Sequence, residues 1–178
     1  MVFKIKKYFL SWYIYDENKN IVSKIKSKRF WGPVKEIINS DNITVYTTDI
    51  INKPNTTNDS NCVDFKKYML YKNGETIVVA SLLFANNSEK AAFQTMTLRP
   101  PQVDEMLLET PYGVWSAKRQ KDNGIVFYQN KQQIGSISPF FSLKPHIIEF
   151  YKKYNIAFIA GLYVFAEYMM HEDDLIIV

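Results

Sequence analysis

The sequence has few of the residues on which enzyme sites and covalent cross-links depend. Its single cysteine, Cys62, excludes an internal disulfide and a cysteine-only metal cluster. There are two histidines, His146 and His171, and the chain contains no GxSxG, HExxH or phosphate-loop glycine pattern. We therefore expect a protein that is not an enzyme and that carries no metal and no other cofactor.

The chain also has only a small excess of positive charge. The chain has 22 lysine and arginine residues against 18 aspartate and glutamate residues, a net charge of +4. This excess permits an anionic partner but is too small to indicate nucleic acid, which we do not expect as a partner. The single cysteine fits a reducing compartment, and we therefore expect the protein in the cytoplasm. Residues 1–20 lack the small-residue cleavage site of a secretory signal and fit a first strand instead.

Short runs rich in β-branched and aromatic residues alternate with polar turn clusters along most of the chain. We expect residues 1–178 to form one domain, because no shift in composition divides them. The clearest turn lies in FKKYMLYKNGETIVVASLLF, where Asn73-Gly74 supplies the positive φ angles of a two-residue hairpin. Similar patterns predict roughly ten to twelve strands, a number typical of a β-sandwich or barrel.

The individual strands are predicted from these turn signals. Residues 3–15 and 21–31 are predicted to pair as a hairpin about the polar segment DENKN. A further strand is predicted at AAFQTMTLRP, residues 91–100, whereas QVDEMLLE, residues 102–109, is ambiguous between a short helix and a strand. The proline-punctuated segment that follows Ser138 gives no clear element before the last helix.

A long uncharged stretch lies within YNIAFIAGLYVFAEYMMHEDD near the C-terminus. Residues 156–166 have no charge and no polar stripe, so a helix here is apolar on every side and must be enclosed. The run is shorter than the about 20 apolar residues of a membrane span. We therefore predict a central buried helix at residues 154–170 inside a closed or nearly closed sheet. We expect Glu167 near the barrel mouth, where water reaches it.

Three segments carry a resemblance to a known family: YIYDENKNIVSKIKSKRFWGPVKEI, TPYGVWSAKRQKDNGIVFYQNKQQIGSIS and KPHIIEFYKKYNIAFIAGLYVFAEYMMHEDDL. The pattern resembles small bacterial members of the tubby C-terminal-like superfamily, which includes LURP-one-related plant proteins and phospholipid scramblases. The resemblance implies a mostly β fold, a single antiparallel β-barrel enclosing a hydrophobic C-terminal helix. It also implies a non-enzymatic domain, since the better-known relatives hold lipid headgroups with basic residues on the barrel surface.

A row of basic residues is the best candidate for an anionic contact. Lys24, Lys26 and Lys28 occupy alternate positions of the strand predicted at residues 21–31, so they share one face, and Arg29 follows them. Cations on one face of a strand can meet phosphate oxygens. Charged outward residues also protect a sheet from edge association, and this second interpretation stays open. Our hypothesis is an anionic ligand-binding set of Lys24, Lys26, Lys28 and Arg29.

Two other polar clusters have simpler explanations. Lys118, Arg119 and Lys121 fit a solvated turn. HEDD, residues 171–174, fits the exit of the last helix into water better than a metal site, because consecutive residues rarely converge on one ion.

Two functions fit these features of the sequence. The first is non-enzymatic binding of anionic phospholipid headgroups or of a membrane surface, with the cytoplasmic protein peripheral to the membrane. The alternative is a cytoplasmic protein–protein interaction module, of a regulatory or immunity type, with no lipid ligand.

Overall fold

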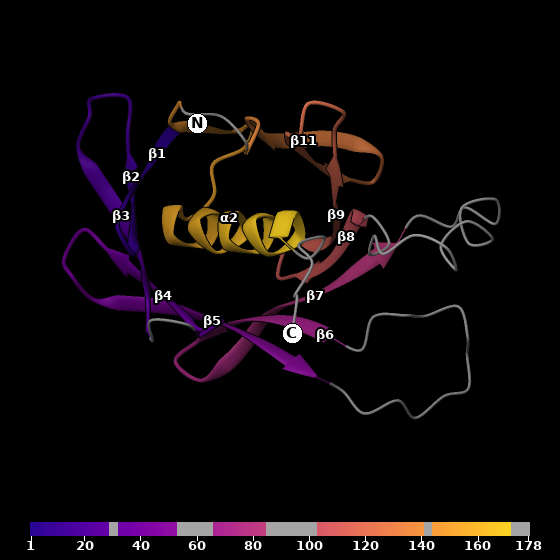
Figure 1. Ribbon diagram of the computed structural model, residues 1–178, viewed down its shortest axis with the longest axis horizontal. Helices are drawn as coiled ribbons and strands as arrows, with labels where there is room; N and C mark the ends of the chain where they lie inside the picture. The colour runs from indigo at the N-terminus through magenta and orange to yellow at the C-terminus, as the bar shows by residue number, and fades with distance from the viewer. Residues whose placement is uncertain (29–31, 53–65, 85–102, 141–143, 172–178) are drawn as a thin grey trace.

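The computed structural model describes residues 1–28, 32–52, 66–84, 103–140 and 144–171. These residues form twelve strands and one helix, which are shown in Figure 1. The strands are β1 (Val2–Tyr8), β2 (Ser11–Tyr15), β3 (Ile21–Ser27), β4 (Lys35–Asn39), β5 (Thr44–Asn52), β6 (Lys66–Lys72), β7 (Glu75–Phe84), β8 (Val103–Thr110), β9 (Gly113–Arg119), β10 (Ile125–Gln129), β11 (Gln132–Ile137) and β12 (His146–Phe150). The helix is α2 (Ile156–His171).

The strands form a closed antiparallel barrel. Each strand pairs with its neighbour in sequence, and pairing between β1 and β12 closes the circle. This seam is short, because it joins only four residue pairs, from Val2 opposite Glu149 to Ile5 opposite His146. The predicted barrel of ten to twelve strands around a C-terminal helix is confirmed.

The interior of the barrel is filled by α2, which lies across it in Figure 1. All residues from Ala157 to Ala166 are buried, as are Met169 and Met170. The strands supply the surrounding wall through their alternation, since Phe3 and Ile5 of β1 are buried while the residues between and beyond them are exposed. A helix without a polar face is therefore covered on its whole circumference by sheet.

Two local features place the helix. The side-chain Oδ1 of Asn155 accepts hydrogen bonds from the backbone N–H groups of Ala157, at 2.9 Å, and Phe158, at 3.3 Å, which makes Asn155 the N-cap. Gly161 allows a close approach to the wall, because a Cβ atom there would lie 2.9 Å from both terminal methyl groups of Leu70. The helix consequently packs closely against β6.

The C-terminal half of α2 is tied to the wall by hydrogen bonds. The hydroxyl groups of Tyr168 and Thr48 lie 2.9 Å apart, and Tyr168 also donates to the backbone carbonyl of Pro33. Thr48 is fully buried, so this contact provides a partner for a hydroxyl that water does not reach.

Aromatic side chains fill the barrel around the N-terminal end of α2. The ring centroid of Trp115 lies 5.1 Å from that of Tyr154 and 5.9 Å from that of Phe158, both edge to face. Phe150 of β12 joins the same cluster, at 5.6 Å from Tyr154. This end of the barrel interior is therefore apolar.

Several predicted strands are confirmed, and one boundary is wrong. The β6–β7 hairpin turns at Asn73 and Gly74, with φ angles of 52° and 84°. The three strands predicted between residues 112 and 138 are β9, β10 and β11, and the ambiguous residues 102–109 largely form β8. The strand predicted at 91–100 lies outside the described residues.

The prediction of a single strand at residues 3–15 is wrong. The segment forms two strands, β1 and β2, that turn back on each other at Phe9 and Leu10. Phe9 has a φ of 55°, but neither turn residue is a glycine, asparagine or proline, so the sequence carries no turn signal here. The strand predicted at 21–31 is β3, which ends at Ser27. β12 was not predicted.

Truncation of a helix residue should measure the contribution of the enclosed helix. Leu162 of α2 is fully buried, and we expect Leu162→Ala to lower the free energy of unfolding by about 2–5 kcal/mol because it leaves a cavity. Leu107, which is 38% exposed on the outside of β8, is the matched control, and Leu107→Ala should cost less than about 1 kcal/mol. Urea unfolding followed by circular dichroism compares the two. Equal losses would contradict the enclosure of α2.

Candidate functional site

A basic and aromatic surface covers the outside of β1, β2 and β3. We call the lysines Lys4, Lys6, Lys24 and Lys26, with the tyrosines Tyr13 and Tyr15, the basic face. Strand register interleaves the two residue types, because Tyr13 of β2 pairs with Lys6 on one side and with Lys24 on the other, while Tyr15 pairs with Lys4. The Nζ atoms of Lys24 and Lys6 lie 5.0 Å and 5.5 Å from the ring centroids of Tyr13 and Tyr15.

Within the described part of the chain, the positive charge of the basic face is not neutralised by ion pairs. Among the described residues, no carboxylate oxygen lies within 4.0 Å of the amino group of any of its four lysines. Glu36 is directly opposite Lys26 in the β3–β4 pairing, yet the two side chains form no ion pair. The carboxylate of Asp16, in the adjoining turn, instead accepts hydrogen bonds from Asn20. The basic face is therefore free to attract an anion.

The hypothesised set of Lys24, Lys26, Lys28 and Arg29 is placed only in part. Lys24 is half-buried and Lys26 exposed, and both lie on the outer face of β3, while Lys28 is exposed just beyond the end of the strand. Arg29 lies outside the described residues.

The structure adds Lys4 and Lys6, which sequence reasoning missed. Their alternation with the buried Phe3 and Ile5 could have revealed them. The pairing of β1 with β2 and of β2 with β3 then brings them beside Lys24 and Lys26.

Lys118 and Arg119 of the other basic cluster lie at the end of β9 and not in a turn, and both form contacts with neighbouring residues. Lys118 forms an ion pair with Glu105 at 3.3 Å. The guanidinium of Arg119 donates to the side-chain oxygen of Asn123, at 3.2 Å from Nε and 2.9 Å from Nη2. Arg119 and Lys118 therefore offer less to a ligand than the basic face does.

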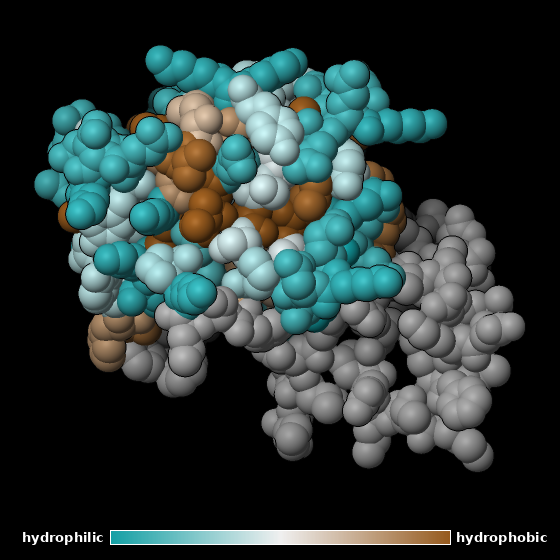
Figure 2. Space-filling model, turned by 90° about the horizontal axis from the view of Figure 1, so that it is seen from above, coloured by the Kyte–Doolittle hydropathy of each residue, from teal (hydrophilic) through white to brown (hydrophobic). Residues whose placement is uncertain are grey.

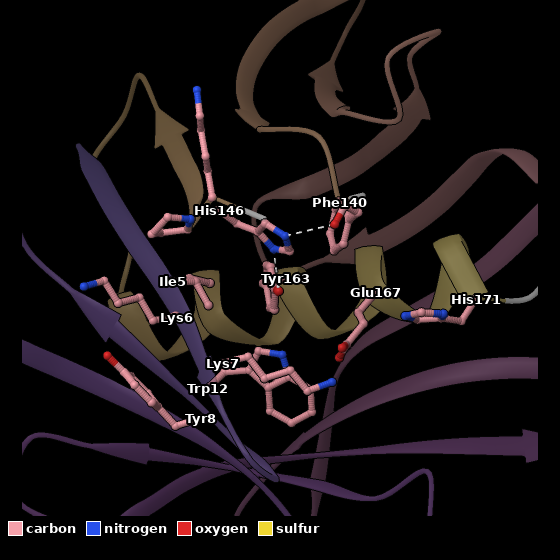
Figure 3. A pocket seen from close by; sticks show the side chains of 12 residues that line it. Ile5, Lys6, Lys7, Tyr8, Trp12, Phe140, His146, Tyr163, Glu167 and His171 are labelled. Atoms are coloured by element: carbon pink, nitrogen blue, oxygen red, sulfur yellow. Dashed lines mark hydrogen bonds between the residues drawn. The ribbon is translucent and has the colours of Figure 1, made fainter. Parts of the chain in front are cut away.

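A cavity of about 450 Å³ opens beside the β1–β12 seam. The seam ends at Ile5 and His146, so the next residues of β1, Lys6 to Tyr8, have no β12 partner. Pro145 precedes β12 and has no N–H to extend the ladder. Figure 3 shows side chains of β1 and α2, together with Phe140 and His146, around this space.

The view onto the barrel from above shows the mixed character of this side of the molecule. In Figure 2, hydrophilic side chains cover most of the margin of this face, and apolar side chains lie between them. The cavity lining has the same mixture, because Lys6, Lys7 and Lys144 stand beside Tyr8 and Phe140.

In the cavity wall, hydrogen bonds join Tyr163 of α2 to His146 and His146 to Phe140. The two nitrogens of His146 lie 2.7 Å from the hydroxyl of Tyr163 and 3.2 Å from the carbonyl oxygen of Phe140 (Figure 3). A carbonyl only accepts, so Nε2–H donates to Phe140 and the Tyr163 hydroxyl donates to Nδ1. Burial lowers the pKa of His146 and raises that of Tyr163. Both ring nitrogens are therefore engaged, and the His146–Tyr163 pair fastens Phe140 and His146 to the helix.

Two lysines lie close to Trp12, which lines the cavity. The Nζ atoms of Lys7 and Lys35 lie 4.8 Å and 5.3 Å from its ring centroid. The half-buried Glu167 of α2 points into the same space as Lys7 (Figure 3). Burial raises the pKa of Glu167, while the nearby charges of Lys7, Lys35 and His171 act in the opposite direction. Because Glu167 is half-buried and lines the cavity, it lies at the opening of the barrel, as the sequence indicated.

The described part of the chain contains neither a candidate metal site nor a helix that could span a membrane. No three potential ligands among histidine, cysteine, aspartate and glutamate come together there. His171 lines the cavity, and the other residues of HEDD lie outside the described ranges. The helix in this part of the chain is too short to span a bilayer.

Comparison with known proteins identifies a likeness in fold. No protein-family model matches the chain, and no curated protein is significantly similar to it in sequence. A solved structure of a protein from Arabidopsis thaliana superposes with a TM-score of 0.52, covering 93% of this chain and 88% of that one. The sequences are 12% identical, so the likeness concerns the fold alone.

Removal of the Glu167 charge should change how stability depends on pH. Because its pKa is raised in the folded state, Glu167 ionises more readily when the protein is unfolded. As the pH rises through 4.5, the ordinary pKa of a glutamate, Glu167 ionises in the unfolded state before it ionises in the folded state. The wild type therefore loses stability over this pH range. We expect Glu167→Gln to become increasingly more stable than the wild type between pH 4 and pH 7, as measured by urea unfolding. Glu109→Gln, on the exposed outer face of β8, is the control, and a similar pH trend in both variants would contradict the explanation.

Proposed function

We propose that this protein is a non-enzymatic binding module that docks on anionic membrane surfaces through its basic face. The observation that carries the proposal is the cross-strand arrangement of Lys4, Lys6, Lys24 and Lys26 around Tyr13 and Tyr15, without a carboxylate partner among the described residues. Such a surface presents several positive charges in one plane, which a bilayer can meet at once.

Physical magnitudes support a membrane as the partner. A lysine near an anionic bilayer contributes about 1 kcal/mol, so four together give useful affinity although each alone does not. Tyrosine rings are enriched at the level of lipid headgroups because they combine an apolar body with a polar tip. Attraction of this kind is screened over about 10 Å at 0.1 M salt. The proposed binding therefore weakens as salt is added.

The fold is consistent with the family resemblance, and we include the family in the proposal. A closed barrel around one apolar helix is the arrangement that the tubby C-terminal-like superfamily implies. In this proposal the protein works in the cytoplasm and associates with the membrane peripherally, by its surface and not by a spanning segment.

A protein-interaction module is the second candidate, and a different surface favours it. Leu83, Leu107 and Val114 are 40%, 38% and 64% exposed on the outside of β7, β8 and β9. Apolar side chains of this kind on neighbouring strands fit the surface of another protein better than a charged headgroup layer. Stoichiometric capture of one protein that is lost in Val114→Lys, with no effect of lipid, would favour this candidate.

Charge reversal tests the membrane proposal. The variant in which Lys4, Lys6, Lys24 and Lys26 are all changed to glutamate should bind phosphatidylglycerol vesicles at least about tenfold more weakly in low salt. Co-sedimentation without detergent measures binding, with phosphatidylcholine vesicles for comparison. The wild type should bind only the anionic vesicles, and its binding should weaken strongly in high salt.

The control for this variant carries the same change in net charge at other places. It replaces four exposed lysines outside the basic face by glutamate: Lys72, Lys121, Lys131 and Lys152. This control should keep most of the binding. Equal losses in both variants would mean that net charge and not the basic face determines binding, and absence of binding by the folded wild type would exclude the membrane proposal.

A further inference from the structure

The tip of the β1–β2 hairpin carries an aromatic residue in an unusual position. Phe9 is 86% exposed, and the preceding Tyr8 is 54% exposed. The φ angle of Phe9 is 55°, in the left-handed region. The other non-glycine residues with positive φ in the described part of the chain are asparagines and lysines, and Phe9 is the apolar exception among them.

Neither backbone preference nor packing explains a phenylalanine at this place. Two-residue hairpin turns favour glycine, asparagine or aspartate where φ is positive, because a larger side chain strains the backbone. The Phe9 ring gains almost nothing from burial in return, since most of it is exposed to water. A residue that costs stability and adds no packing is a candidate for a functional role.

The register of the strands places this tip at one end of the basic face. Tyr8, Ser11 and Lys26 pair across β1, β2 and β3 and form a row of residues next to the hairpin turn. The following row is formed by Lys6, Tyr13 and Lys24. The rings of Tyr8 and Tyr13 meet edge to face at 5.6 Å. From the tip inward, the apolar Phe9 ring is thus followed by rows in which tyrosines and lysines lie side by side.

We infer that Phe9 is an apolar anchor that enters the interfacial layer of an anionic bilayer. Tyr8 and Tyr13 then lie at headgroup level, and the lysines of the basic face reach the lipid phosphates. This inference rests on the proposed membrane function and adds the depth and orientation of docking. This arrangement fits a bilayer surface, because an apolar ring at the tip can reach the edge of the hydrocarbon while the tyrosines and lysines behind it contact the headgroup layer together.

An inserted ring gives membrane binding a component that salt does not screen. The attraction of the lysines falls with ionic strength, whereas burial of an aromatic ring is insensitive to it. The wild type should therefore retain weak binding to anionic vesicles at a salt concentration at which the lysine contribution is largely lost. That residual binding is what Phe9 supplies.

Phe9→Gly is the direct test. Glycine adopts positive φ without strain, so this variant should fold, with a thermal midpoint within about 5 °C of the wild type. We expect its binding to phosphatidylglycerol vesicles to fall by about tenfold at both low and high salt, in a co-sedimentation assay. Val114→Ser is the control, because Val114 is an exposed apolar residue on β9, outside the basic face. This control should bind like the wild type.

Phe9→Trp reports the position of the ring directly. This variant should bind at least as well as the wild type, and its additional fluorescence over the three native tryptophans should shift to the blue and be quenched by brominated lipids. If the wild type binds and the lysine variant does not, but Phe9→Gly binds like the wild type, the anchor is excluded while the membrane function stands. Water-like emission from the Phe9→Trp side chain on vesicle-bound protein would also exclude the anchor. If the folded wild type binds no vesicles, both proposals fail.

Discussion

Enclosure of a helix that is apolar on every side is the constraint on which the rest of this structure depends. Water must be excluded from the whole circumference between Ala157 and Ala166, and a single sheet face covers only part of it. A closed sheet meets this requirement, and it also removes the edges by which open sheets associate. The exterior of each strand is then released from core packing. This freedom lets β1, β2 and β3 carry lysines and tyrosines at their outward positions.

The opening beside the seam follows from the same constraint. Because the barrel closes through only four residue pairs between β1 and β12, the wall ends before the C-terminal end of the helix, which carries Glu167. Glu167 and Lys7 line the opening there, where water can reach charges that the interior could not hold. The N-terminal end of the helix has no such need, and aromatic rings around Trp115 fill it. One helix is thus packed in apolar surroundings at one end and in mixed surroundings at the other.

Sequence reasoning succeeded where the decisive physics is local. The missing polar stripe of residues 156–166 was sufficient to predict a buried helix, and Asn73-Gly74 was sufficient to predict a hairpin, since positive φ is a property of those residues. It failed at Phe9, where a residue with no turn preference makes the turn. Lys4 and Lys6 were missed as a consequence, because the segment looked like one strand. The cavity depends on a pairing between Ile5 and His146, which no local pattern encodes.

The pairing of β1 with β12 also determines when the barrel can form. Residues near Val2 must wait for residues near Glu149 before the circle closes, and α2 follows β12 in the chain. During synthesis, the sheet therefore remains an open ribbon with an exposed apolar inner face until nearly all of the described chain has emerged. Folding that relies on such distant contacts is slow. The nascent protein is consequently exposed to aggregation for longer than a protein built from local helices, and helix docking and seam closure form one late, cooperative event.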